Sequence, residues 1–197
     1  MRIAVAGATG RVGRHVVDVL EKGGHDVVAI SRSSGVDLIT SQGLEEALDG
    51  VGCVIDVASG ASPEQEAATR FFTTASRNLQ AAGVRAGVRR IIVVSVIGTD
   101  RFTSGYGAAK VAHEQAMLAG PIPVRILRAA QLHEFVAQLL EWGRRGDVSY
   151  LPRMRTQLVA AGPFHVELGA TYPLEDAGQA HREIGRHHLG KLALRIH

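Results

Sequence analysis

The stretch "RIAVAGATGRVGRHVVDVL", residues 2–20, decides the fold class. It consists of a short apolar run, three glycines at positions 7, 10 and 13, and a segment with apolar residues at helical spacing. Gly7 permits a tight turn, Gly10 lets backbone amides close on a pyrophosphate, and Gly13 lets the helix pack against the strand. The start of that helix adds partial positive charge. The stretch predicts a phosphate-binding loop, with a merely structural turn as the alternative.

The rest of the chain alternates β-branched runs with longer helical patterns, which indicates a parallel sheet covered on both faces. Strands are expected at residues 2–7, 26–31, 35–39, 53–58, 90–95 and 124–129, and helices at 11–22, 42–49, 63–82, 107–119 and 131–143. The link 32–34 between the second and third strands is too short for a helix. The pattern predicts an α/β fold of the Rossmann type, a doubly wound parallel sheet in three αβα layers.

Composition narrows the class of protein. A chain of 197 residues, 46% hydrophobic, suits a single domain over 1–197. Beyond about residue 147 we expect extended pieces at 148–151 and 156–161, then an atypical C-terminal helix starting near Pro173 and a last strand at 191–196, within a tail over 160–197. No charged leader or run of 18 apolar residues is present, so cytoplasmic localisation without a membrane partner is expected.

Charge and cysteine usage exclude further classes. The formal net charge is only +3 and the arginines are scattered among acids, so no nucleic-acid partner is expected. The single cysteine, Cys53, lies in an apolar run and is interpreted as a buried structural thiol. The nine histidines do not form a ligand set with a second shell, and no metal is predicted. A small-molecule substrate is expected, and a homodimer is possible on the sequence alone.

The segment after residue 30 indicates which dinucleotide the loop would bind. Arg32 lies between Ser31 and Ser33, with no acidic residue to bind a ribose hydroxyl. A guanidinium beside hydroxyl groups suits a 2′-phosphate, so NADPH is favoured over NADH, with a surface arginine as the alternative. The remaining cofactor contacts are expected from the glycine loop, from the end of the third expected strand and from the end of the fourth: Thr9, Arg11, Val12, Asp37, Leu38, Val57 and Ala58.

The pair Tyr106 and Lys110, in "YGAAK", lies on one helix face one turn apart. Random placement of three tyrosines and three lysines gives such a pair roughly one time in twenty, so the spacing alone is a weak signal. The two readings are a proton relay and two ordinary residues at the start of a helix.

Four motifs in order carry a family resemblance: "GATGRVG" at 7–13, "VVSVIGTD" at 93–100, "YGAAK" at 106–110 and "ILRAAQLHEF" at 126–135. Over about residues 1–159 the chain resembles the atypical short-chain dehydrogenase/reductases, within them the NmrA-like NAD(P)H-binding group. The resemblance implies a nicotinamide cofactor and hydride transfer. It makes Tyr106 the acid/base, Lys110 its partner and a ligand of the nicotinamide ribose, and Ser95 the residue that polarises the substrate carbonyl, with Thr99 as a competitor.

Physical chemistry supports this arrangement of three side chains. Lys110 and an oxidised nicotinamide are both cationic, so they would lower the pKa of Tyr106, and Ser95 would donate to a developing oxyanion. Gln131, His133 and Phe135 follow the last strand of the main series, where open α/β sheets bind ligands, and are candidate pocket residues. For His133 a capping or solvent-facing role is the alternative.

The tail follows a different pattern. Residues 162–197 resemble the C-terminal end of quinone-reductase-type medium-chain dehydrogenases, and only a helix and a strand are carried over. We therefore expect an NADPH-dependent oxidoreductase that reduces a small carbonyl or quinone. The alternative is an NAD(P)-binding redox sensor or regulator of the NmrA-like type that does not turn over substrate.

Overall fold

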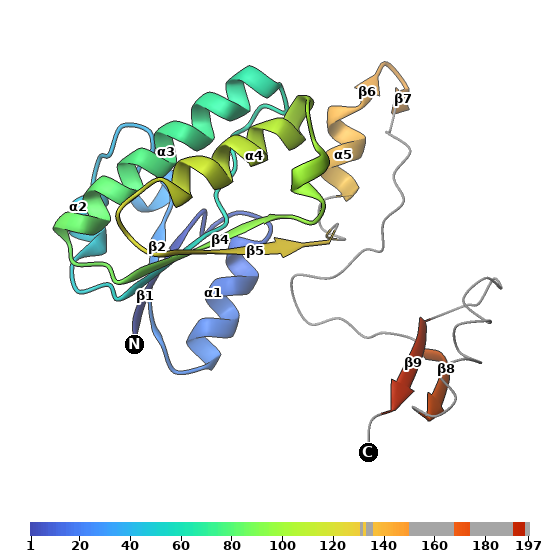
Figure 1. The fold of residues 1–197 in the computed structure, drawn as a ribbon, viewed down its shortest axis with the longest axis horizontal. Helices are drawn as coiled ribbons and strands as arrows, with labels where there is room; N and C mark the ends of the chain where they lie inside the picture. The colour runs from blue at the N-terminus through green and yellow to red at the C-terminus, as the bar shows by residue number, and fades with distance from the viewer. Residues whose placement is uncertain (131, 133–135, 150–167, 174–190, 196–197) are drawn as a thin grey trace. The chain divides into compact units, whose positions relative to one another are not determined.

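A computed structural model describes residues 1–130, 132, 136–149, 168–173 and 191–195 (Figure 1). The chain divides into two compact units, Met1–Gly162 and Pro163–His197. The single domain expected over 1–197 stays a prediction.

The first unit contains a parallel five-stranded sheet in the order β2-β1-β3-β4-β5. Its strands are β1 (Arg2–Ala6), β2 (Asp26–Ile30), β3 (Cys53–Asp56), β4 (Arg90–Val96) and β5 (Val124–Ala129). After β2 the chain returns to the opposite side of β1 and forms β3. The carboxyl ends of β1 and β3 therefore lie at the topological switch point, where open α/β sheets bind ligands.

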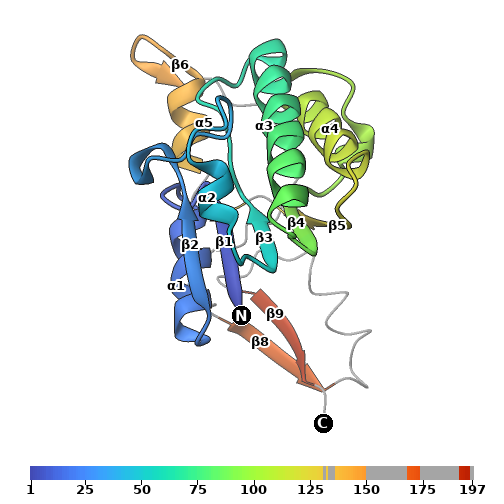
Figure 2. The ribbon, with the colours of Figure 1, turned by 90° about the vertical axis from the view of Figure 1, so that its left-hand side faces the viewer.

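Helices cover both faces of this sheet, which confirms the three-layer doubly wound fold. They are α1 (Gly13–Lys22), α2 (Leu44–Leu48), α3 (Gln65–Arg85), α4 (Gly105–Leu118) and α5 (Val136–Trp142). Helix α1 lies on one face, and α3 and α4 lie side by side on the other (Figures 1 and 2). Strand β1 is buried from Ile3 to Ala6 because both of its faces are covered, whereas β5 at the sheet edge is only partly buried.

The predicted strand at 35–39 is wrong, so the sheet has five strands instead of six. The segment after β2 forms a short 3₁₀ helix, η1 (Arg32–Ser34), closed by a capping box between Ser31 and Ser34. Gly35 follows with φ +80°, and the Asp37 carboxylate accepts the N–H groups of Ile39 and Thr40 at 2.6 and 3.2 Å. The backbone hydrogen bonds are thus made locally and not to a neighbouring strand. The crossover is also longer than expected, since α2 belongs to it.

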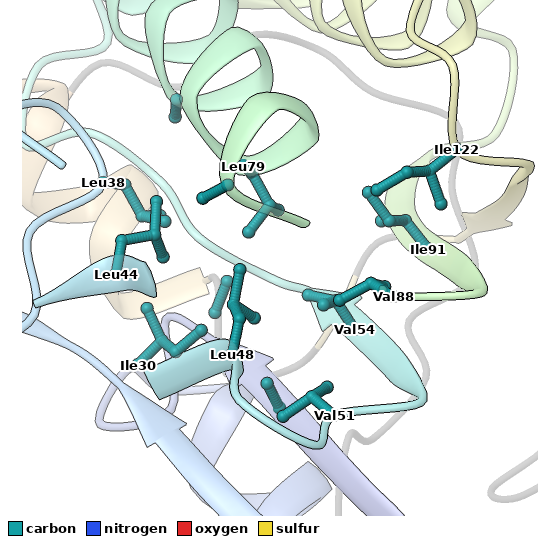
Figure 3. Close-up of a cluster of buried hydrophobic side chains, with 14 of the residues drawn as sticks. Ile30, Leu38, Leu44, Leu48, Val51, Val54, Leu79, Val88, Ile91 and Ile122 are labelled. Carbon is teal, nitrogen blue, oxygen red and sulfur yellow. The ribbon is translucent and has the colours of Figure 1, made fainter. Parts of the chain in front are cut away.

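The main hydrophobic core lies between the sheet and α2 and α3. Figure 3 shows Leu79 of α3 facing Leu44 and Leu48 of α2, with Ile30 of β2 and Val54 of β3 beside them. All five side chains are fully buried. Each one contributes about 1.5–3 kcal/mol on burial, so this cluster fixes the strands whose carboxyl ends carry the site.

The remaining described elements are short. A second 3₁₀ helix, η2 (Thr99–Arg101), follows β4, and β6 (Arg144–Arg145) pairs antiparallel with β7 (Val148–Ser149). The second unit contains β8 (Leu168–Pro173) and β9 (Lys191–Arg195), which pair in parallel. The last predicted strand is confirmed as β9. The helix predicted after Pro173 and the extended piece at 156–161 lie outside the described residues.

Candidate functional site

The glycine loop after β1 has the geometry that the sequence predicts. Gly7 has φ +81°, and a Cβ atom there would lie 2.8 Å from the Ala58 Cα atom. A Cβ atom on Gly13 would lie 2.0 Å from the Gly7 carbonyl oxygen. Gly10 donates its N–H to the same oxygen at 2.9 Å. Side chains at positions 7 and 13 would therefore block the close approach between this loop, the start of α1 and the segment after β3.

Two cavities share this loop as a border. The larger has a volume of about 560 Å³ and the smaller about 360 Å³. Gly10 and the segment Val57–Ser59 line both of them. An extended ligand with a pyrophosphate at its centre fits such a pair, because the middle of the ligand would lie at the glycine loop and the two ends in separate cavities.

The smaller cavity contains several of the residues predicted to contact the cofactor. Thr9, Ser31, Arg32, Asp37 and Leu38 all line it, whereas Ser33 is not among the lining residues. The Ser33 hydroxyl lies 3.0 Å from that of Ser31, inside the η1 turn.

Sequence reasoning missed Asn78 of α3. Its side-chain amide donates to the carbonyl oxygens of Leu38 and Ile39 at 2.8 and 2.9 Å. Asn78 therefore positions the cavity-lining segment from a helix 40 residues further along the chain.

The larger cavity brings the three expected catalytic side chains together. Ser95, Tyr106 and Lys110 line it, with Arg11 and Val12 from the glycine loop. Thr99 is not among the lining residues. The remaining wall is mostly apolar and includes Pro63, Phe102, Leu132, Leu139 and Trp142. Gln131, His133 and Phe135 lie outside the described residues, although Leu132 between them reaches the cavity.

Tyr106 is in an apolar setting that keeps it protonated. Its ring centroid lies 5.8 Å from that of Phe72 and 5.7 Å from that of Trp142. Burial and the negative charge of Asp56 raise the pKa of Tyr106 to about 12. This is the reverse of the lowered pKa expected from Lys110, because desolvation disfavours the phenolate. A protonated phenol suits a residue that donates a proton to a reduced substrate.

Lys110 is directed partly into the protein interior. Its Nζ atom donates to the Val94 carbonyl oxygen at 2.9 Å, lies 2.8 Å from Nδ1 of His113, and sits 4.6 Å from the Phe72 ring centroid. Burial lowers the pKa of Lys110 to about 8, although the charges of Asp56 and Glu114 act in the opposite direction. At neutral pH Lys110 is therefore mainly charged.

Asp56 and His113 complete a buried polar chain that sequence reasoning did not identify. Nε2 of His113 lies 3.0 Å from Oδ2 of Asp56, and Oδ1 of Asp56 accepts the Ala58 N–H at 2.9 Å. The His113 ring stacks on Phe72 with centroids 4.5 Å apart. A signal was available, since His113 follows Lys110 by three positions and thus shares its helix face.

Ser95 takes part in a second polar cluster around Glu114. Burial would raise the pKa of Glu114, but hydrogen bonds from Arg128, Ser95 and Thr99 lower it overall. Arg128 donates to both carboxylate oxygens of Glu114, at 3.1 and 2.7 Å. The Ser95 and Thr99 hydroxyls lie 3.4 Å apart. The Ser95 hydroxyl lines the cavity and also lies close enough to the Glu114 carboxylate to lower its pKa, so this carboxylate competes with a substrate for the Ser95 proton.

A comparison with protein families decides the family. The profile described as NAD(P)H-binding matches residues 7–134, which include the glycine loop and both sets of cavity-lining residues up to β5. The chain belongs to the NAD(P)H-binding family. No curated protein matches it in sequence.

Solved structures confirm the Rossmann fold and the resemblance to the short-chain dehydrogenase/reductases. A superfamily member from Agrobacterium tumefaciens with bound NAD is 26% identical, with a TM-score of 0.56 over 68% of this chain and 50% of that one. A UDP-N-acetylglucosamine 4-epimerase from Bacillus cereus is 22% identical (TM-score 0.58; 68% and 54% covered). The triphenylmethane reductase of Citrobacter sp., complexed with NADP(H), is 21% identical (TM-score 0.50; 73% and 56% covered). This chain thus spans about half the length of each.

The described part of the chain lacks two further kinds of feature. No helix there is long and apolar enough to cross a membrane. Within the same residues, no three His, Cys, Asp or Glu side chains are grouped as metal ligands would be.

Proposed function

We propose that this protein is an NADPH-dependent oxidoreductase that reduces a small carbonyl or quinone, with Tyr106 as the proton donor. The observation that carries the proposal is one cavity lined both by the glycine loop and by Ser95, Tyr106 and Lys110. A dinucleotide that crosses the glycine loop would have its nicotinamide end in the cavity that contains the proton donor.

The choice of NADPH rests on the smaller cavity. Arg32 and Ser31 line it and can donate to a 2′-phosphate. The acidic side chain in the same cavity, Asp37, is engaged in its own turn, where it accepts two backbone N–H groups. A cation without a competing free acid favours the phosphorylated cofactor over NADH.

The chain's own residues would act as follows. When bound, NADPH supplies the hydride. Tyr106 donates its proton to the substrate oxygen, and its high pKa ensures that the proton is present at neutral pH. The Lys110 ammonium at the cavity wall stabilises the negative charge that develops on the substrate oxygen and on the phenol. Ser95 can donate to the substrate oxygen in competition with the Glu114 carboxylate, whose pKa it helps to lower.

The cavity wall indicates the kind of substrate. Phe102, Leu139 and Trp142 add apolar surface to the wall that contains Ser95, Tyr106 and Lys110. Such a wall favours a flat, mainly apolar compound with a reducible oxygen, such as a quinone or an aromatic aldehyde. Apolar neighbours also lower the local dielectric constant, which strengthens the electrostatic effect of Lys110.

The test is a fluorescence titration with NADPH followed by turnover on a panel of quinones and aldehydes. Trp142, the only tryptophan, lines the larger cavity and reports binding directly. Tyr106→Phe should lower kcat about 10²- to 10⁴-fold and leave the Kd for NADPH unchanged. Unchanged turnover in this variant would refute the role of Tyr106.

One observation favours a redox sensor as the second candidate. Lys110 donates to Val94 and contacts His113 inside the protein, so its contacts are structural as well as cavity-facing. A sensor would bind NADPH with the same affinity in wild type and Tyr106→Phe, would reduce no compound of the panel, and would change its affinity for a protein partner with the ratio of NADPH to NADP.

A further inference from the structure

Three ionisable side chains form a continuous buried chain beside the larger cavity. Asp56 at the end of β3, His113 of α4 and Lys110 of α4 are 2%, 1% and 5% exposed. The two links measure 3.0 Å from Asp56 to His113 and 2.8 Å from His113 to Lys110. Buried polar groups of this kind are stable only when each is paired.

The direction of the hydrogen bonds follows from the chemistry of the end groups. An ammonium has no acceptor atom, so Nδ1 of His113 must accept from Lys110. The proton of the neutral imidazole is then on Nε2 and is donated to the Asp56 carboxylate. Both end groups require the same tautomer. The polar chain therefore consists of a carboxylate, a neutral imidazole and an ammonium, and these three side chains together carry no net charge.

Both ends of this buried polar chain, Asp56 and Lys110, reach the proposed cofactor site. Lys110 lines the larger cavity, and Ala58, whose N–H is bound by Asp56, lines both cavities. The Phe72 ring fixes the middle of the chain, because it stacks on His113 and also lies against Lys110. The side-chain geometry is thus set by contacts from β3, α3 and α4 together.

We propose that Asp56 and His113 are positioning residues that keep the Lys110 ammonium charged and in place at the wall of the larger cavity. Two N–H groups of Lys110 are used by Val94 and His113, which leaves one for the cavity. The other charged groups near Lys110 are Glu114 on the same helix, which also favours the ammonium, and Asp56 itself. The Glu114 charge is shared with Arg128, so Asp56 is the carboxylate that lacks an arginine partner among the described residues.

The consequence for catalysis rests on the proposed function, but the charge of Lys110 can be measured without any turnover. The whole protein has three lysines, Lys22, Lys110 and Lys191, so ¹³C labelling of lysine gives a spectrum that single substitutions can assign. In the wild type the Lys110 Cε signal should titrate with a pKa of about 8. In Asp56→Asn this midpoint should fall by about one pH unit or more, because the favourable charge is removed.

A fall of that size has a clear consequence at neutral pH. With a midpoint of 8 Lys110 is about 90% charged at pH 7, and with a midpoint of 7 it is about half charged. An unchanged midpoint in Asp56→Asn would overturn the proposal.

A second variant covers the case in which Asp56→Asn fails to fold. His113→Asn places an amide oxygen near the former Nδ1 position, so Lys110 keeps an acceptor while the link to Asp56 is cut. Loss of the His113 hydrogen bond raises the pKa of the buried Asp56 and thus weakens its negative charge, so the Lys110 midpoint should fall in this variant as well. An unchanged midpoint would again contradict the inference. Ser76→Ala is the matched control, since Ser76 is fully buried and its hydroxyl donates to the main-chain carbonyl oxygen of Phe72 at 2.7 Å, with no hydrogen bond to Asp56, His113 or Lys110. Its Lys110 midpoint should equal that of the wild type.

The pH profile of kcat/KM separates positioning from a merely structural role. Activity should fall as the pH rises through about 8, where Lys110 loses its charge, and in Asp56→Asn this fall should occur at lower pH. A uniform loss of activity with an unmoved profile would show a structural role and refute the inference. Absence of turnover in the wild type would refute the proposed function instead, while the lysine titration still decides the inference.

Discussion

The buried ammonium of Lys110 makes a sharp prediction about how stability depends on pH. The pKa of Lys110 is lowered from 10.5 to about 8 in the folded chain. Between these values the unfolded chain binds more protons than the folded one, so the free energy of unfolding rises with pH. The whole effect is about 3.4 kcal/mol, from a difference of about 2.5 at 1.36 kcal/mol for each pH unit. Between pH 7 and pH 9.5 the rise is about 2 kcal/mol.

Lys110→Met removes this contribution and leaves all other titrating groups in place. We expect the free energy of unfolding of the wild type to rise by about 2 kcal/mol relative to the variant between pH 7 and pH 9.5. Urea unfolding, monitored by the fluorescence of Trp142, measures the free energy of unfolding at each pH. Stopping at pH 9.5 limits ionisation of Tyr106 in the unfolded chain, which matters because the pKa of Tyr106 is raised in the folded state from 10 to about 12.

The control is Lys22→Met, which removes a lysine whose side chain is 70% exposed and pairs with Asp18 on α1. This variant should show the same pH dependence as the wild type. If the curves of Lys110→Met and the wild type run parallel, Lys110 is not buried with its charge and the reasoning about the polar chain is wrong.

Two further predictions concern the proposed cofactor and substrate contacts. Arg32→Gln should weaken NADPH binding roughly ten-fold, about 1.4 kcal/mol, and leave NADH binding unchanged. The control is Arg77→Gln on α3, which makes the same charge change outside both cavities. An equal loss of affinity for both cofactors would contradict a 2′-phosphate contact. Ser95→Ala should lower kcat/KM by less than about ten-fold, far less than Tyr106→Phe, because the Glu114 carboxylate competes with the substrate for the Ser95 proton. A loss as large as that of Tyr106→Phe would show that Ser95 donates to the substrate.

The sequence alone was sufficient for the fold because its signals are local. The strand, the three glycines and the helix of residues 2–20 form one contiguous unit, and the structure shows why residues 7 and 13 must lack a side chain. The alternation of apolar runs gave five of the strands in the first unit. The alternation gave a wrong strand at 35–39, because a strand and a buried loop can show the same alternation of apolar residues. In this segment Gly35 and Asp37 form turns instead.

The site was predictable only in part, for a related reason. The glycines, Arg32, Tyr106 and Lys110 belong to motifs with fixed spacing along the chain, so a pattern can identify them. Asp56 lies 57 residues from His113, and Asn78 lies 40 residues from Leu38. No spacing rule connects such pairs.

The sequence therefore determined that this chain folds around a dinucleotide loop and that a tyrosine and a lysine share a helix face. The tertiary structure decided their charge states. Burial, the Asp56 carboxylate and the His113 imidazole meet only when β3, α3 and α4 pack together. A pKa depends on what surrounds a group in space, and that information is absent from the order of residues along α4.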